Sequence, residues 1–305
     1  MYQINNASWG KSISSSFPMR ILGAVGFHKV AWRLRRLHCP VKRGALVLEI
    51  GAGGNPYPRA NVLLDAYEDT VERREKLLVN DRPLVLGFAE NLPFRDKSFD
   101  FIIASHVLEH SKDPEAFIKE LMRVGKAGYI ETPDAFFERI NTWTFHRLEI
   151  TERKGVLKIH KKHSWRVSAE LVELYEAKMK PALMWLWERH PSPFATQFYW
   201  QDQIDYEILN PEVDINWPLP AEAYQNKSGG SESLHRTIFL KTIRFLFSQN
   251  SRNRKINIIN LLRCPKCFHN TLLEEIGQLF CSACKSRYQT RDGIMIMETS
   301  KNSLF

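Results

Sequence analysis

A continuous apolar segment, Ala45 to Ile50, ends directly at three glycines, Gly51, Gly53 and Gly54, and this junction restricts the fold more than any other feature. An apolar run interrupted only by Glu49 is typical of a strand buried on both faces, as strands of parallel sheets are. Glycines after such a strand let the backbone turn tightly and approach a ligand that a Cβ would keep away. The junction therefore predicts a parallel α/β sheet with a ligand-binding turn.

Further short apolar segments follow this one, and helical patterns lie between several of them. Asp113 and Pro114 predict a helix start, with Asp113 as N-cap and Pro114 at the first helical position. Strands alternating with helices at this spacing predict a doubly wound α/β domain. We expect strands at 61–65, 83–87, 99–104, 128–130 and 198–209, and helices at 17–38, 68–79, 165–189 and 235–247, the last one basic and amphipathic.

Length and charge limit the remaining classes of protein. The 305 residues can form one large domain and one small one, and no apolar run approaches the roughly 20 residues of a membrane-spanning helix. Because 21–27 is a short segment followed by charge, it is no signal peptide, and we expect a cytoplasmic protein. The net charge of +9 comes from basic residues at the two ends of the chain. These basic segments could bind nucleic acid, an anionic membrane or a phosphorylated substrate, or could only solubilise the protein. Nothing in the sequence supports the membrane contact specifically.

The glycine turn differs from a dinucleotide-binding fingerprint. The third glycine of that fingerprint would fall at Pro56, and Pro56 with Pro58 prevents an early helix. A hydride-transfer enzyme would therefore lack the helix N-terminus that holds a pyrophosphate, whereas a cofactor without phosphates does not need one. Asp65 ends the second predicted strand, where a carboxylate can accept both hydroxyls of a ribose or simply end the strand.

Two further stretches, 87–94 (GFAENLPF) and 98–110 (SFDFIIASHVLEH), complete a pattern that begins at Glu49. In this order, over about residues 45–133, the chain resembles the class I S-adenosylmethionine-dependent methyltransferases of the small-molecule type, which include the quinone-biosynthesis methyltransferases. The resemblance implies a Rossmann-like, seven-stranded methyltransferase sheet. It also implies that the cofactor is bound by Glu49, Gly51, Gly53, Asp65, Ala89, Glu90 and Ser105.

The resemblance also leaves the chemistry of the site open at two points. Phe88 stands where the family usually has the Asp that receives the adenine amino group, so stacking would replace a hydrogen bond at a cost of about 1–2 kcal/mol, or the site is degenerate. His106 is the first candidate for a catalytic base and His110 the second, but both histidines could instead only shape the cofactor pocket. Further candidates are Glu131, Asp134, His146, His160 and His163, and the spacing of the last three gives no recognised metal site.

Four cysteines form two pairs near the end of the chain, Cys264 with Cys267 and Cys281 with Cys284, thirteen residues apart. Two Cys-x-x-Cys turns at such spacing are typical of a tetrahedral zinc site whose four thiolates leave no open position. The segment 258–298 resembles the zinc-ribbon subunits that bind and activate tRNA and translation-factor methyltransferases. That resemblance implies that the ribbon docks on the methyltransferase domain of its own chain, although zinc ribbons also bind nucleic acid or other proteins.

These observations predict a domain order and a leading function. We expect a basic helical segment over 1–44, an S-adenosylmethionine-binding domain over 45–210, a linker with an amphipathic helix over 211–257 and a zinc ribbon over 258–300. The leading hypothesis is methyl transfer to a small-molecule or glycan-type acceptor. The alternatives are an RNA or protein methyltransferase and a non-catalytic scaffold with a degenerate cofactor site.

Overall fold

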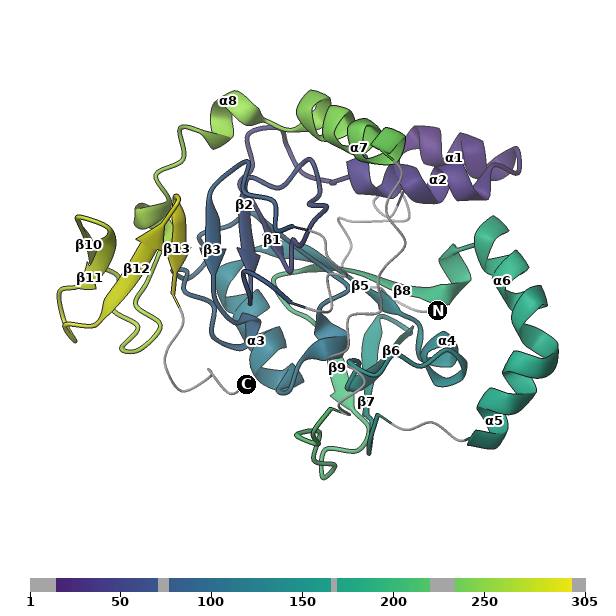
Figure 1. Ribbon diagram of the computed structural model, residues 1–305. Coiled ribbons are helices and arrows are strands. Elements are labelled where there is room, and N and C mark those ends of the chain that lie inside the picture. Colours follow the sequence, from purple (N-terminus) through teal and green to yellow (C-terminus); the bar gives the residue numbers. More distant parts are fainter. Residues whose placement is uncertain (1–14, 71–76, 166–168, 220–233, 298–305) are drawn as a thin grey trace. The chain divides into compact units, whose positions relative to one another are not determined.

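The computed structural model describes residues 15–70, 77–165, 169–219 and 234–297 (Figure 1). The chain divides into two compact units, which are taken one at a time below. Unit 1 comprises residues 1–40, 104–112 and 129–225, and unit 2 comprises residues 41–103, 113–128 and 226–305. The domain boundaries expected from the sequence remain predictions.

The sheet of unit 2 contains the predicted strands β1 (Val47–Ile50), β2 (Val62–Asp65) and β3 (Leu84–Leu86), in the order β3-β2-β1, followed by β4 (Phe101–Ser105). β1 pairs with β2, and β2 with β3, in parallel. Every residue of β1, β2 and β3 is buried, as the continuous apolar runs predict. Helix α3 (Pro114–Val124) begins at the expected N-cap, because the Asp113 carboxylate accepts a hydrogen bond of 2.9 Å from the Ala116 N–H.

The C-terminal strands continue this sheet and do not form a separate one. The sequence had instead predicted a seven-stranded sheet and a small zinc ribbon beside it. β10 (Leu272–Glu275), β11 (Gln278–Cys281), β12 (Arg287–Arg291) and β13 (Ile294–Ile296) form an antiparallel meander. β13 then pairs in parallel with β3, so it lies beside the methyltransferase strands in Figure 1. The turn between β12 and β13 is Asp292-Gly293, both at positive φ, which is the backbone that a tight hairpin requires.

Short helices accompany the sheet of unit 2. The basic helix α7 (Leu234–Phe247) confirms the helix predicted at 235–247, and α8 (Asn250–Asn253) follows it. Unit 2 also contains two 3₁₀ helices. η3 (Ala89–Asn91) belongs to its segment 41–103, and η8 (Ile258–Leu261) belongs to its segment 226–305. Residues 71–76 of the helix predicted at 68–79 lie outside the described residues, and 68–70 and 77–79 are not helical.

Unit 1 begins with two helices, α1 (Phe17–Ala24) and α2 (His28–Leu34), and the 3₁₀ turn η1 (Arg35–Leu37), so the predicted helix at 17–38 is interrupted once. Its strands β5 (Ala127–Pro133) and β8 (Ala195–Gln201) lie in the order β4-β5-β8. The short helices η4 (Leu108–His110) and α4 (Ala135–Ile140) follow β4 and β5. The helix predicted at 165–189 consists, where described, of α5 (Ala169–Leu174), the π-helix η5 (Tyr175–Met179) and α6 (Lys180–Arg189).

A second, three-stranded sheet in unit 1 corrects the prediction for its C-terminal part. β6 (Leu148–Arg153) and β7 (Val156–Lys161) form a hairpin that the sequence analysis did not foresee. The single strand expected at 198–209 is wrong, because β8 ends at Gln201 and β9 (Tyr206–Ile208) pairs with β7 in the order β6-β7-β9. Asp202 has a φ of +60°, which ends the extended conformation between the two strands.

Among the described residues of both units, none of the helices is long and apolar enough to cross a membrane.

Candidate functional site

The glycine turn of unit 2 is held against β2 by backbone hydrogen bonds. Gly51 and Gly53 have φ values of +68° and +54°, a region in which a side chain is strained and glycine is favoured. The Gly51 N–H donates to the Leu64 carbonyl at 2.8 Å. The Gly53 N–H donates to Oδ2 of Asp65 at 2.9 Å. The predicted turn and the predicted acid are therefore parts of one structure at the carboxyl ends of β1 and β2.

Two buried carboxylates shape this turn. Asp65 is 8% exposed, and its Oδ1 lies 3.4 Å from the Tyr67 N–H, so the carboxylate is oriented from both sides. Glu49 is 3% exposed, and its Oε2 accepts a hydrogen bond of 2.7 Å from the Tyr57 N–H. Glu49 thus fixes the segment that follows the glycines, where Pro56 and Pro58 exclude a helix.

The third part of the predicted cofactor site lies beyond β3. Ala89 and Glu90 belong to η3, and the Gly87 N–H before them donates to the Asp65 carbonyl at 2.9 Å. A Cβ on Gly87 would lie 3.3 Å from the Pro93 ring, a tighter contact than most Cβ atoms make. Phe88 meets the ring of Tyr67 edge to face, with 5.7 Å between the centroids. The aromatic pair therefore lies next to the Asp65 turn, where the family places the adenine-binding Asp.

In unit 1, His106 follows β4 and lies between two buried carboxylates. Its φ is +58°, a strained conformation for a residue with a Cβ, and its N–H donates to the Glu131 carbonyl at 2.7 Å. Nδ1 lies 3.3 Å from Glu109 Oε1, and Nε2 lies 3.2 Å from Glu131 Oε1. Burial lowers the pKa of His106, but the neighbouring carboxylates of Glu109 and Glu131 outweigh it and raise the pKa to about 10. The ring therefore carries its proton at neutral pH, and both of its nitrogens are directed at protein carboxylates.

Glu131 is the centre of this arrangement. It is fully buried, and Arg35 from η1 binds it with Nε at 2.7 Å from Oε2 and Nη2 at 2.8 Å from Oε1. Ser105 Oγ lies 3.4 Å from Oε1, and Tyr129 donates its hydroxyl hydrogen to Oε2. Burial raises the pKa of Glu131, but the hydrogen bonds and charges of Arg35 and His106 hold it well below its ordinary value.

The sequence analysis missed Arg35 as a functional residue. The N-terminal segment 1–48 contained the available signal, because it has eight Lys or Arg and no acid. Any ion pair made by these residues must therefore use a carboxylate from another part of the chain. The Arg35 guanidinium also lies 3.9 Å from the centre of the Trp32 ring, which fixes it from the other side.

The remaining predicted histidines of unit 1 separate into two groups. His110 and His146 lie together, with ring centroids 4.6 Å apart and the rings nearly perpendicular. His160 instead lies 3.4 Å from Glu149 on the β6–β7 hairpin, and His163 is exposed. Asp134 caps α4 and accepts a hydrogen bond of 2.6 Å from Thr151, which is a structural role.

The four predicted cysteines of unit 2 come together. Their sulfur atoms all lie within 4.8 Å of one another, with 3.6 Å between Cys264 and Cys284 and 3.5 Å between Cys267 and Cys281. Zinc–sulfur bonds of about 2.3 Å in a tetrahedron place the sulfurs about 3.8 Å apart, so the cluster fits a zinc ion. The Tyr288 hydroxyl lies 3.0 Å from the Cys264 sulfur, within range for a hydrogen bond that would orient this ligand.

The two cysteine turns have the same backbone geometry, which is the observation that most favours a metal. In each turn the residue after the second cysteine has a φ of +62°, at Phe268 and at Lys285. Its N–H donates to the carbonyl of the first cysteine, at 2.8 Å in one turn and 3.0 Å in the other. Two sequences that share only their cysteine spacing thus adopt one conformation, as expected for two halves of a tetrahedral site.

Within unit 2, the cysteine-bearing segment is attached to the methyltransferase strands by more than β13. Arg95 donates from Nε to the Leu262 carbonyl at 3.0 Å, and its N–H donates to Leu261 at 2.8 Å. The Arg263 N–H donates to the Pro93 carbonyl at 3.0 Å, and its guanidinium lies 3.4 Å from Glu120. The segment therefore docks on the domain of its own chain.

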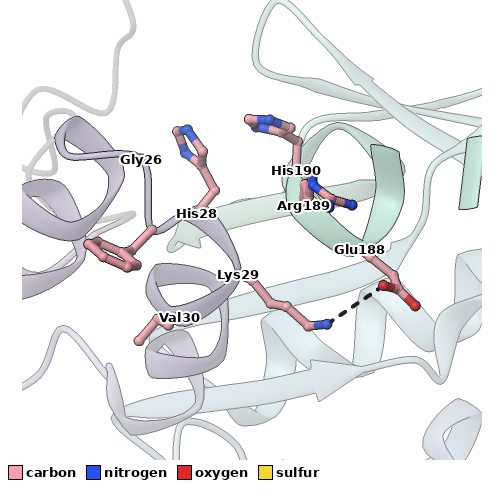
Figure 2. A pocket seen from close by; sticks show the side chains of 8 residues that line it. Gly26, His28, Lys29, Val30, Glu188, Arg189 and His190 are labelled. Atoms are coloured by element: carbon pink, nitrogen blue, oxygen red, sulfur yellow. Dashed lines mark ion pairs between the residues drawn. The ribbon is translucent and has the colours of Figure 1, made fainter. Parts of the chain in front are cut away.

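A pocket of about 420 Å³ lies in unit 1 between the start of α2 and the end of α6 (Figure 2). His28 and His190 both line it, with their rings 4.4 Å apart, and Lys29 pairs with Glu188 at 4.0 Å. None of the predicted site residues lines this pocket, so we assign it no part in the chemistry.

Comparisons with known proteins relate the chain to methyltransferases. A family model described as a methyltransferase domain matches residues 48–130. The ubiquinone/menaquinone biosynthesis C-methyltransferase UbiE of Xanthomonas campestris pv. campestris is 30% identical over 177 residues, covering 50% of this chain and 69% of that protein. The UbiE of Pasteurella multocida is 26% identical over 181 residues, covering 52% and 67%. The solved structure of YcgJ from Bacillus subtilis is 25% identical, with a TM-score of 0.27, and covers 35% of this chain and 51% of that one.

The chain belongs to the S-adenosylmethionine-dependent methyltransferase family of these relatives, and it is such an enzyme. It spans about two thirds of the length of the UbiE proteins and about half of YcgJ.

Proposed function

We propose that the enzyme binds S-adenosylmethionine at the glycine turn and transfers its methyl group to a small-molecule acceptor. The hydrogen bond between Gly53 and Asp65 carries this proposal, because it joins a turn that admits a ligand to a carboxylate positioned for ribose hydroxyls. Glu49 would hold the turn from behind, and Ala89 and Glu90 would border the adenine. Phe88, packed on Tyr67, would offer an aromatic edge in place of the missing carboxylate.

S-adenosylmethionine supplies a methyl group that its positive sulfur already activates, so the protein mainly aligns the acceptor and excludes water. Ser105 and His106 are the proposed residues at the reacting end, and His110 is the second candidate base. Because its pKa is raised to about 10, His106 can act as a base only after a carboxylate partner has taken its proton. We therefore favour an acceptor that loses its own proton readily.

The acceptor class is supported by the relatives rather than by a pocket. The UbiE proteins are named for ubiquinone and menaquinone biosynthesis, which supports a small aromatic acceptor for this chain over a glycan, an RNA or a protein. The test is transfer of a tritiated methyl group from S-adenosylmethionine to a panel of hydroquinones, sugar nucleotides, RNA and protein. We expect label in the hydroquinones. Label found only in RNA or protein would overturn the proposed acceptor class.

We also propose that the cysteine cluster holds one structural zinc ion that fixes the ribbon on β3. Four thiolates leave no coordination position open, so the ion would take no part in methyl transfer. Metal analysis of the purified chain should find zinc that Cys264→Ser removes and Cys39→Ser does not. Equal zinc in both variants would exclude this cluster as the site.

A further inference from the structure

Three side chains of unit 1 that could bind a metal lie together after β4. They are Glu109 and His110 from η4 and His146 from the segment that precedes β6. One potential ligand atom of each residue lies within 4.8 Å of the corresponding atom of the other two. The sequence hides this cluster, because His146 is 36 positions away and the spacing resembles no known metal motif.

The backbone brings the two segments together. The Arg147 N–H donates to the Glu109 carbonyl at 2.7 Å, so the residue after His146 is bonded to η4. The Lys162 N–H in turn donates to the Arg147 carbonyl at 2.9 Å, which ties the segment to the end of β7. The His146 ring is stacked on Trp143, with an angle of 23° between the rings. The position of His146 beside Glu109 is thus fixed by backbone hydrogen bonds and ring packing together.

His146 has a carboxylate partner of the kind that orients metal ligands. Its Nδ1 lies 2.7 Å from Glu138 Oε2, and both residues are buried. The Lys162 ammonium holds the other oxygen of Glu138 at 3.1 Å. A histidine that donates its Nδ1 hydrogen to a carboxylate presents a basic Nε2 lone pair, which is the arrangement behind most histidine ligands of metals.

Glu109 supplies the second independent observation. It is 1% exposed, and within the described residues neither of its carboxylate oxygens accepts a hydrogen bond of good geometry. One cationic neighbour is His106, whose Nδ1 lies 3.3 Å from Oε1. Because a buried carboxylate is costly unless donors or cations surround it, these two oxygens favour a bound cation.

We propose that Glu109, His110 and His146 form a binding site for one divalent transition-metal ion. Two imidazoles and one carboxylate favour Zn²⁺, Fe²⁺ or Mn²⁺ over Mg²⁺ or Ca²⁺, which prefer oxygen ligands throughout. Bonds of about 2.1 Å would bring the ligand atoms to about 3–3.5 Å from one another, so the side chains must close by rotation when the ion binds. Three protein ligands leave coordination positions open.

The open positions suggest a role that rests on the proposed function. An ion there would bind oxygen atoms of the acceptor and lower the pKa of an acceptor hydroxyl. Binding of the ion itself depends on the three ligands alone. The metal site and the proposed methyl transfer can therefore be disproved separately.

The test is a count of metal ions followed by titration with Mn²⁺, observed through the electron paramagnetic resonance signal of the free ion. Four-thiolate sites bind Mn²⁺ poorly, so the cysteine cluster does not interfere. The full chain, stripped by a chelator, should bind one Mn²⁺. Glu109→Gln and His146→Gln should weaken that binding more than a hundredfold, and Glu138→Gln, which keeps every ligand, about tenfold. His163→Ala, an exposed histidine nearby in sequence, should bind like the unaltered protein.

Three results would overturn the site. The first is an unaltered chain that contains no metal beyond the cysteine cluster and does not bind Mn²⁺. The second is unchanged Mn²⁺ binding by Glu109→Gln. The third is Mn²⁺ binding that His163→Ala weakens as much as Glu109→Gln does. If His146→Gln does not fold, as judged by circular dichroism, His110→Gln replaces it. Binding of S-adenosylmethionine, measured on the same samples, separates loss of this site from failure of the proposed function.

Discussion

The Gly53 N–H donates a 2.9 Å hydrogen bond to the carboxylate of Asp65, and this bond joins the loops after two adjacent parallel strands. The acid is thereby fixed at the edge of the sheet where open α/β folds bind their ligands. Asp65 is buried to 92% of its surface, and the glycine turn sets the orientation of the carboxylate that we propose binds the cofactor.

Replacing Gly53 by alanine should strain the turn. A residue with a Cβ at a φ of +54° costs about 1–2 kcal/mol, so the free energy of unfolding in urea should fall by about that amount. Gly44→Ala is the matched control, because a Cβ there meets nothing within 4 Å and its φ is not positive, so its stability should change by less than about 0.5 kcal/mol. Equal losses in the two variants would show that the conformation of Gly53 is unimportant.

Removing Arg35 should destabilise unit 1 strongly. Among the described residues, Arg35→Ala leaves the fully buried Glu131 with His106 as its remaining cation, and breaking a buried pair in this way costs about 3 kcal/mol. Arg20→Ala removes an exposed arginine of the same N-terminal segment and should change stability by less than about 0.5 kcal/mol. Urea unfolding followed by circular dichroism measures both, and similar small effects would contradict the assigned role of Arg35.

The same pair predicts an acid dependence of stability. The groups that face Glu131 are Arg35, His106, Tyr129, Ser105 and Gln197, and the first two hold its pKa well below the ordinary value. A depressed carboxyl pKa stabilises the folded state fully above the unfolded pKa of about 4.3, and that contribution is lost as the pH falls further. The difference between the unaltered chain and Arg35→Ala should therefore be constant from about pH 5.5 to 8 and shrink below about pH 4. A difference that grows in acid would refute this reading of the pair.

Local signals explain what the sequence predicted correctly. The buried strand before Gly51 and the Asp113 cap are set by neighbours in sequence, so patterns and turn chemistry suffice to find them. The same holds for the paired cysteine turns, because four thiolates at this spacing have few other uses.

Distant contacts explain what the sequence did not predict. Arg35 and Glu131 are 96 residues apart, and nothing near Arg35 indicates its partner. The β6–β7 hairpin turns at Lys154-Gly155. Its alternation of apolar and polar residues is short and includes many charged residues, so the pattern did not indicate strands. The strand expected at 198–209 was divided by one left-handed residue, Asp202, which an apolar pattern does not reveal. The pairing of β13 with β3 joins segments some 210 positions apart, which local periodicity cannot report.

Removal of the proposed zinc should affect β3 as well as the ribbon. Because β13 pairs with β3, loss of the ribbon exposes the edge that Leu84 and Val85 share with Ile294 and Met295. After chelation we expect faster amide hydrogen exchange in β10–β13 and in β3, with little change in α3. Cys264→Ser should reproduce this pattern without a chelator, and Cys39→Ser should not. Exchange confined to 264–284 would mean that β13 holds its place without the metal.

The most direct test of the cofactor site is calorimetric titration of the full chain with S-adenosylmethionine, compared with Asp65→Asn and with Asp69→Asn. Asp69 is an exposed acid four positions away and serves as the matched control. We predict saturable binding that Asp65→Asn weakens at least about tenfold, or about 1.4 kcal/mol, and that Asp69→Asn leaves unchanged. Equal affinity in Asp65→Asn, or no binding by the unaltered chain at millimolar ligand, would contradict the placement of the cofactor at the glycine turn.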